Sequence, residues 1–201
     1  MRFATKSVKK LWPIAPLLAG LIVGCATSPQ PESSEPVSRD QAFATRNQGY
    51  SLLYGLMSDE KDVSKLLLIK HEKSDVGELI REIARTSGEA AKQLENYEKA
   101  DPHLHLKMTG LPKAEEQTRA LISKTTAKEL LSKGGEKFEV RILLTQNEAL
   151  RYGSHLALVI QTMETEPERK KFLGETSQKL AALHQRVIDL FHARWNEPTT
   201  K

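Results

Sequence analysis

Apolar side chains recur at helical spacing along the chain from residue 39 onward, and no long alternating run indicates a β-strand. Aromatic residues make up only 5% of the chain, which also argues against sheets. The predicted helices cover about residues 40–57, 60–99, 112–133, 136–166 and 167–195. Prolines and the Gly134-Gly135 pair separate the later segments, because neither continues a helix well.

The last two predicted helices have the most regular pattern. In the fourth, the expected core positions follow one another at intervals of four and three: Phe138, Ile142, Thr145, Ala149, Tyr152, Leu156, Val159 and Met163. The fifth repeats this rhythm from Leu173 to Arg194. Seven-residue repeats on helices joined by short connections predict left-handed packing of antiparallel neighbours. We therefore expect an all-α, antiparallel up-down helical bundle with four main helices and a shorter N-terminal helix.

Two helix boundaries stay open in the sequence. Ser58-Asp59 can end the first helix, cap the second or merely interrupt one long segment. Within the second segment, the residues from Asp75 to Glu78 read as a capping box. The helix is therefore either continuous from residue 60 or broken near Ser74 and begun again.

The segment before the predicted bundle has a different composition. Residues 26–38 contain three prolines, several serines and almost nothing apolar, so they predict a flexible tether. Upstream, Arg2, Lys6, Lys9 and Lys10 precede an uncharged apolar run over 11–24. That run is too short for a membrane-spanning helix, which needs about 20 apolar residues. A basic head followed by a short apolar stretch is typical of a secretory signal.

The end of that run, Leu21-Ile22-Val23-Gly24-Cys25, resembles the lipobox of bacterial lipoproteins. The resemblance covers residues 1–25 and implies cleavage between Gly24 and Cys25, followed by acylation of Cys25. It also implies attachment to a lipid bilayer in the bacterial envelope. Because Ala26 rather than Asp follows the cysteine, it favours the periplasmic face of the outer membrane over the inner membrane. The alternative is an uncleaved anchor followed by a buried free cysteine.

These boundaries give four parts: a signal peptide at 1–24, the lipidated Cys25 with its tether at 25–38, a bundle at 39–195 and a polar tail at 196–201. Charge supports the division. Four of the 30 basic residues precede the cysteine and no acidic residue does, so the remaining 26 basic residues balance 26 acidic ones. The overall excess of positive charge therefore gives no argument for a nucleic-acid partner, and we expect none.

One polar flank of the fourth predicted helix offers candidate ligands. Glu148, Tyr152 and His155 lie close together in register, but Glu148 and His155 are two turns apart, roughly 10 Å along the axis. They need help from another helix to bind one ion, and Glu72 is the candidate partner. No Glu-x-x-His pair of a di-iron bundle is present. The alternative is a flank that is solvated or hydrogen-bonded to another helix.

The stretch from Lys137 to Ala157 is weakly similar to helices of an uncharacterised class of exported ferritin-like bundles in bacteria, which lack consistent metal ligands. We find no catalytic motif, expect no cofactor, and leave an enzymatic role open. The leading hypothesis is a membrane-anchored envelope lipoprotein whose bundle acts as a binding or scaffolding module. Another envelope protein is the expected kind of protein partner. The alternative is a bundle that binds a small ligand or a metal.

Overall fold

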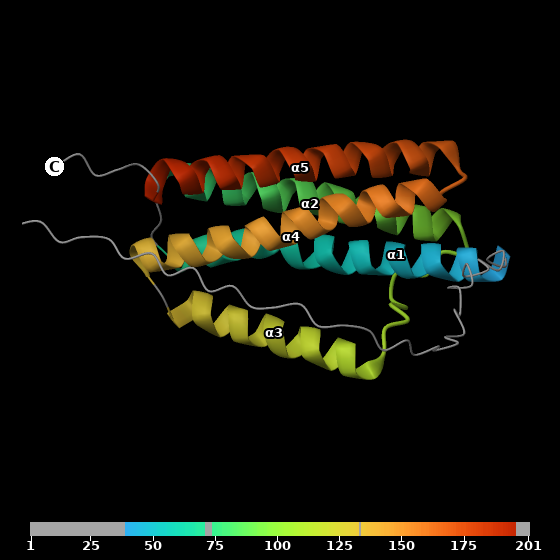
Figure 1. Ribbon diagram of the computed structural model, residues 1–201, viewed down its shortest axis with the longest axis horizontal. Coiled ribbons are helices and arrows are strands. Elements are labelled where there is room, and N and C mark those ends of the chain that lie inside the picture. The colour runs from blue at the N-terminus through green and yellow to red at the C-terminus, as the bar shows by residue number, and fades with distance from the viewer. Residues whose placement is uncertain (1–38, 71–73, 133, 196–201) are drawn as a thin grey trace, which may run out of the picture. The chain divides into compact units, whose positions relative to one another are not determined.

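The computed structural model describes residues 39–70, 74–132 and 134–195, which lie in one unit, Val37–Lys201. The described residues form five α-helices, one 3₁₀ helix and no strand, so the all-α prediction is confirmed (Figure 1). The elements are α1 (Arg39–Glu60), η1 (Val63–Leu68), α2 (Ser74–Ala100), α3 (Lys113–Ser132), α4 (Gly135–Met163) and α5 (Pro167–Trp195).

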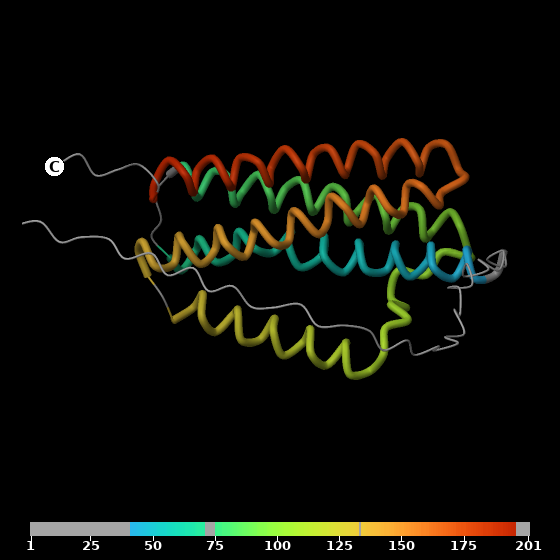
Figure 2. Tube along the Cα trace, in the orientation of Figure 1, coloured from blue at the N-terminus to red at the C-terminus, as the bar shows by residue number. Residues whose placement is uncertain are grey.

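Four of these helices pack as a bundle in which every neighbour is antiparallel. α1 contacts α2 and α4, and α5 contacts the same two helices, so α2 and α4 occupy opposite corners. α2 and α4 run in the same direction, and α3 carries the chain back along the bundle between them (Figures 1 and 2). Four antiparallel helices with one long crossover is the connectivity found in ferritin-like bundles. Here the crossover itself is helical.

The N-terminal helix is a full member of this bundle. Tyr50, Leu53 and Met57 of α1 are completely buried. α1 and α4 also approach closely where glycine replaces a side chain. A Cβ at Gly49 would lie 2.7 Å from Cγ1 of Ile160, and one at Gly153 would lie 2.9 Å from Cδ2 of Leu56. The helix that stands apart is α3 instead, whose one buried residue is Leu130.

The predicted core positions hold in α5 and are shifted in α4. Leu173, Thr176, Leu180, Leu183 and Val187 of α5 are all buried, as their spacing predicts. In α4 the predicted stripe is wrong in its middle, because Tyr152 and Val159 are 40% and 53% exposed. The buried positions there lie one step around the helix: Leu143, Gln146, Leu150, Ser154 and Ala157. Since α4 packs against both α1 and α5, its buried surface is wider than one heptad stripe.

The open boundary in the second segment is resolved by the start of α2 at Ser74. The residues before it form η1 rather than a continuous helix. Ile69, which the helical spacing of the second segment places on the same stripe as Val76, is 66% exposed, and the neighbouring Leu68 is 86% exposed. From Val76 to Leu94, in contrast, the predicted stripe is buried along the whole of α2. The interpretation with a break near Ser74 is therefore correct.

A buried ionic network closes the end of the bundle at the α4–α5 turn. The Glu164 carboxylate accepts a hydrogen bond from the Tyr50 hydroxyl at 2.6 Å. It also accepts from the backbone N–H groups of the two residues that follow Glu164, both at 2.9 Å. Arg46 and Arg169 pair with the same carboxylate at 3.3 Å. Arg169 also pairs with Asp101 at the end of α2, at 2.6 Å. Glu164 therefore joins α1 to the start of α5, and Arg169 extends the network to the end of α2.

A second network lies at the opposite end. Arg194 of α5 pairs with Glu139 of α4 and with Asp75 of α2. The indole N–H of Trp195 donates to Glu136 at 2.7 Å. Both networks are built from arginines whose hydrogen-bonding geometry suits carboxylates. They fix the two ends of the four-helix bundle and leave α3 outside.

No helix in the described part of the chain combines the length and apolarity that crossing a bilayer requires. The predicted signal peptide, the Gly24–Cys25 cleavage site, the lipidated cysteine and its tether fall outside the described residues. The same holds for Glu72 and the polar tail.

Candidate functional site: a groove between α3 and the bundle

α3 is held to the rest of the molecule at a few points. Near its C-terminal end Leu130 is buried, Glu129 pairs with Arg141 of α4, and Lys70 donates to the backbone carbonyl of Leu131. Farther up the helix, the Arg119 guanidinium lies 5.9 Å from the centre of the Tyr152 ring. The apolar residues of α3 are spread around the helix rather than gathered on one stripe. α3 therefore has no continuous apolar face with which to close onto the bundle.

The space left beneath α3 is a groove of about 470 Å³ between α1, η1, α3 and α4. A volume of this order suits a small organic ligand. The apolar wall consists of Leu56, Val63, Leu66, Ile122, Ala127, Leu130 and Ala149. The polar lining consists of Asp59, Glu60, Asp62, Arg119, Ser123, Thr126, Thr145, Gln146 and Glu148. Among these described lining residues, four carboxyl groups therefore face one guanidinium.

Glu60 is the least exposed carboxyl group of the groove, with 8% of its surface accessible. Glu60 is the last residue of α1, and it hydrogen-bonds to Gln146 of α4. The Gln146 side chain is itself buried, at 1% exposed. Within the described part of the chain, neither Oε2 of Glu60 nor Oε1 of Gln146 has a hydrogen-bond partner. Buried polar atoms are nearly always paired in folded proteins. Two unpaired acceptors side by side therefore point to a hydrogen-bond donor that this surface is built to receive.

The surroundings of Glu60 and Asp59 disfavour the ionised forms of these two carboxyl groups. Burial raises the pKa of Glu60 from 4.5 to about 7, and the neighbouring charge of Asp59 adds to the effect, while the Gln146 hydrogen bond lowers it. Burial likewise raises the pKa of Asp59, with a further contribution from Asp62. Perturbed carboxyl groups in a concave site are a feature of functional sites. At neutral pH Glu60 is poised between its protonated and ionised forms.

The position of these carboxyl groups on the helix makes their arrangement more unusual. Cations are favoured at the C-terminal end of a helix, where the peptide dipoles leave a partial negative charge. The last turn of α1 holds no basic residue, and it ends in Asp59 and Glu60. Both side chains line the groove. The groove floor is therefore a place where partial and full negative charges accumulate.

The structure separates the candidate ligands that the sequence suggested. Glu148 lines the groove, and Tyr152 lies at its edge through the contact with Arg119. His155 is exposed, and its Nδ1 lies 3.0 Å from the Arg151 carbonyl oxygen of its own helix. His155 is not among the groove residues. No cluster of three His, Cys, Asp or Glu side chains with metal-binding geometry exists among the described residues.

Sequence reasoning missed Glu60 and Asp59 because it ended the first helix at Met57. The signal was present: two consecutive acidic residues just before a break, on a helix with no basic residue in its last turn. Gln146 was not among the candidate ligands. Gln146 contacts Glu60, which is far away in the sequence, and helical periodicity does not predict contacts between distant residues.

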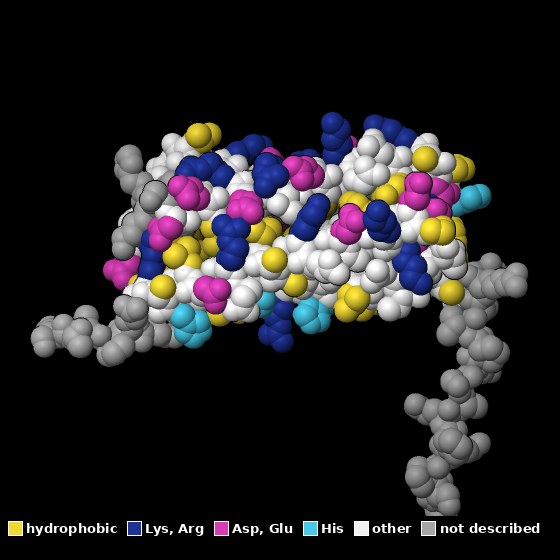
Figure 3. All heavy atoms as spheres, turned by 90° about the horizontal axis from the view of Figure 1, so that it is seen from above, with side chains coloured by type: hydrophobic (Ala, Val, Ile, Leu, Met, Phe, Trp, Pro, Cys, Tyr) yellow, Lys and Arg dark blue, Asp and Glu magenta, His cyan; other side chains and the backbone are white. Residues whose placement is uncertain are grey.

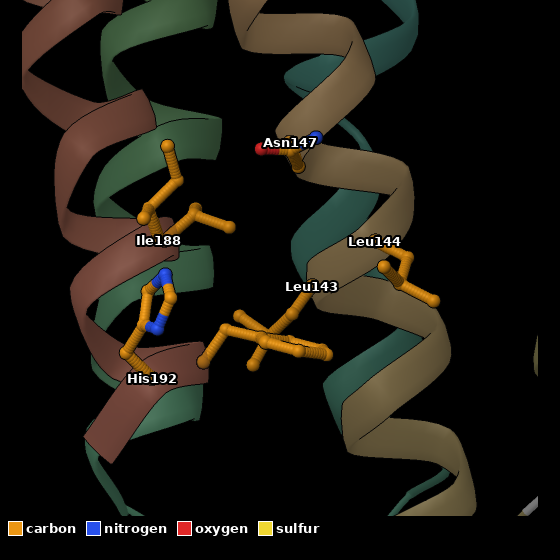
Figure 4. A pocket seen from close by; sticks show the side chains of 7 residues that line it. Leu143, Leu144, Asn147, Ile188 and His192 are labelled. Carbon is orange, nitrogen blue, oxygen red and sulfur yellow. The ribbon is translucent and has the colours of Figure 1, made fainter. Parts of the chain in front are cut away.

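Another pocket, of about 310 Å³, lies on the seam between α4 and α5. Figure 4 shows Ile188 and His192 of α5 across from Leu143 and Asn147 of α4. The polar group of this pocket is already used, because the Asn147 side-chain oxygen lies 2.9 Å from Nε2 of His184. Burial lowers the pKa of His184, and the charges of Arg151 and His155 lower it further. This pocket presents apolar surface without the unpaired acceptors of the groove.

Charge is distributed differently away from the groove. On the face seen in Figure 3, over which α5 runs, basic and acidic side chains are interspersed along the length of the bundle. Away from the groove, Arg186 of α5 pairs with Glu82 of α2 at 2.6 Å. Comparison of the chain with models of protein families, with curated proteins and with solved structures gives no match.

Proposed function

We propose that the protein is a non-enzymatic, lipid-anchored binding module of the bacterial envelope, and that its ligand occupies the groove beneath α3. The observation that carries the binding role is the pair of unpaired buried acceptors, on Glu60 and Gln146, in the lining of a groove that also has an apolar wall. Small-molecule sites in proteins combine apolar walls with a few placed polar groups in this way.

The anchoring half of the proposal rests on the sequence. Its support is the Gly24-Cys25 lipobox, the basic head before it and the proline-rich residues 26–38 after it. Two or more acyl chains give stable membrane attachment, whereas one gives only marginal binding. We place the module on the periplasmic face of the outer membrane, because Ala26 rather than Asp follows the cysteine.

Processing of a Cys25→Ser variant tests the anchor. We expect the variant to keep its signal peptide and to take up no labelled palmitate, since a hydroxyl replaces the thiol that would be acylated. The measurements are the mass of the intact chain and palmitate labelling in cells. Normal cleavage and labelling of the variant would show that the lipobox interpretation is wrong.

Photocrosslinking in cells tests the binding role. A photoreactive amino acid at Ile122 faces the groove, and the same amino acid at Lys92 on α2 serves as the matched control on an exposed position outside it. We expect an adduct at Ile122 that is absent at Lys92, detected as a mass increase of the purified chain. The size of the increase separates a small ligand from an envelope protein. Equal labelling at both positions, or no adduct at Ile122, would refute a ligand in this groove.

A further inference from the structure

We propose that the groove recognises an organic ammonium ion with an apolar body, its charged head placed at Glu60 and Gln146 and its body along the apolar wall. This inference rests on the proposed function, because it names the chemical class of the ligand in the same groove. It is carried by the geometry of three features: the unpaired acceptors, the surrounding charge and the end of α1.

The unpaired atoms specify the head group. Oε2 of Glu60 and Oε1 of Gln146 are both acceptors, and neither has a partner within the described residues. A ligand that meets both must bring at least two N–H or O–H donors. A primary ammonium carries three donors, whereas a carboxylate carries none and an alcohol one. Of these three head groups, the ammonium alone can satisfy both acceptors at once.

The surrounding charge selects a cation over a neutral donor. Asp59 and Glu148 line the groove with Glu60, whereas Asp62 is paired with Lys65 at 2.7 Å. The described cation lining the groove, Arg119, is already paired with Glu115 at 2.7 Å. The C-terminal end of α1 adds the partial negative charge of its peptide dipoles. A bound ammonium therefore supplies the positive charge that the last turn of α1 lacks.

The walls specify the rest of the ligand. Leu56, Val63, Leu66, Ile122 and Leu130 line the groove with aliphatic surface, which a small hydrated metal ion would leave uncovered. The two acceptor atoms are themselves shielded from bulk water. The head group reaches them by displacing side-chain atoms at the groove floor. The sparse packing of α3, whose one buried residue is Leu130, leaves room for that adjustment.

Three six-carbon probes with different head groups test this inference: hexylamine, hexanol and hexanoate. Each is titrated calorimetrically into the full chain held in lipid nanodiscs, with empty nanodiscs subtracted, near pH 8. At that pH Glu60 is mostly ionised and an alkylamine is still protonated. We expect hexylamine to bind at least about tenfold more tightly than hexanol, because charge-assisted hydrogen bonds are about twice as strong as neutral ones.

Two variants assign the selectivity to the proposed atoms. Glu60→Gln keeps the shape but removes the charge, so we expect it to weaken hexylamine binding by about tenfold and to leave hexanol unchanged. Gln146→Met removes the second acceptor and should weaken hexylamine binding by a smaller factor. Glu78→Gln is the matched control, because this exposed glutamate lies on α2 outside the groove. Circular dichroism and the unfolding midpoint establish that each variant is folded.

Any of the following results would overturn the ammonium proposal. The crosslinking experiment at Ile122 distinguishes such a result from failure of the proposed function. Equal binding of hexylamine and hexanol, both weakened by Ile122→Ser, would show an apolar groove without ammonium recognition. Preference for hexanoate would assign recognition to Arg119 instead. Displacement of hexylamine by calcium at equal concentration would indicate a metal site. If no probe binds while Ile122 still gives a crosslink in cells, the groove has a ligand of another class.

Discussion

Two buried glutamates at different corners of the bundle have opposite surroundings. Glu164 accepts from a hydroxyl and two backbone N–H groups and pairs with two arginines. Glu60 has a hydrogen bond from Gln146, and its Oε2 has no partner within the described residues. The pKa of Glu164 lies below its ordinary value although burial opposes this, because the Tyr50 hydrogen bond, a backbone hydrogen bond and the arginine charges outweigh burial. Burial instead raises the pKa of Glu60 to about 7.

The difference separates a structural carboxylate from a candidate functional one. A carboxylate surrounded by donors needs nothing more and holds the segments that supply them. A buried carboxyl group with an unpaired oxygen costs stability unless a ligand or a proton meets it. Proteins keep such costs mainly at functional sites. Glu164 therefore fixes the end of the bundle, and Glu60 identifies the groove as the candidate binding site.

The largest expected effect is at Glu164. Glu164→Ala leaves Arg46 and Arg169 without their shared carboxylate, and breaking a buried ion pair in this way costs about 3 kcal/mol or more. The measurement is the free energy of unfolding from urea titration. Glu168→Ala on the exposed start of α5 is the matched control and should change stability by less than about 0.5 kcal/mol. A loss below about 1 kcal/mol at Glu164 would remove the structural half of the comparison.

The next effect is the pH dependence that Glu60 imposes. Its pKa is about 7 in the folded chain and ordinarily 4.5, so between these values the folded state holds a proton that the unfolded state has lost. The resulting stability is complete below about pH 4.5 and is lost as pH rises through 7, by about 3 kcal/mol. The contribution of Glu164 to stability has the opposite pH dependence. It is present above the ordinary pKa of a glutamate and is lost as pH falls through the lowered pKa of Glu164 in the folded chain.

Glu60→Gln isolates this contribution, since a glutamine does not titrate. We expect the variant to gain stability relative to the natural chain as pH rises from about 5 to 8, because only the natural chain must ionise a buried group. The measurement is the difference in unfolding free energy across that range. Glu78→Gln, at an exposed position, should give a curve parallel to that of the natural chain. Parallel curves for Glu60→Gln as well would mean that Glu60 titrates normally.

A smaller effect is expected from the hydroxyl of Tyr50. Tyr50→Phe removes the 2.6 Å hydrogen bond to Glu164 while keeping the buried ring. Hydrogen bonds to charged groups contribute about 1.5–3 kcal/mol, so we expect a loss of about 2 kcal/mol. Tyr54→Phe, which removes a 2.9 Å hydrogen bond to Glu95 at a less buried position, should cost less. If both variants lose equally little, the remaining donors of Glu164 compensate for the hydroxyl.

Physical reasoning from the sequence predicted those parts of the fold that one-sided periodicity determines. α5 and most of α2 bury a single stripe, and its spacing is visible in the residues. The same reasoning gave the wrong stripe in α4, because α4 buries adjacent positions such as Ile142 and Leu143, and the predicted stripe followed the side of the helix that lines the groove. The peripheral place of α3 had a signal in the sequence that the prediction did not use, because its apolar residues are spread around the helix rather than gathered on one stripe.

The candidate site was less predictable than the fold. Of the candidate ligands on the predicted flank, Glu148 lines the groove, whereas Tyr152 contacts Arg119 of α3 and is not among the lining residues. The contact between Glu60 and Gln146 depends on how α1 packs on α4, which local sequence does not encode. The suggested pairing with Glu72 falls outside the described residues, so it stays a prediction. Acidic residues at the end of a helix were the one local signal that pointed toward the groove floor.

The smallest expected effect on stability is at Ile122, and it contrasts most directly with Glu164. Ile122 is 60% exposed on α3, so Ile122→Ser should change the free energy of unfolding by less than about 0.5 kcal/mol. The same change removes aliphatic surface from the groove and should weaken hexylamine binding severalfold. Leu180→Ser in the bundle core is the matched comparison and should cost several kcal/mol, because its side chain is fully buried. A large loss of stability at Ile122 would show that α3 packs as tightly as the bundle, and that the groove is part of the core rather than a binding surface.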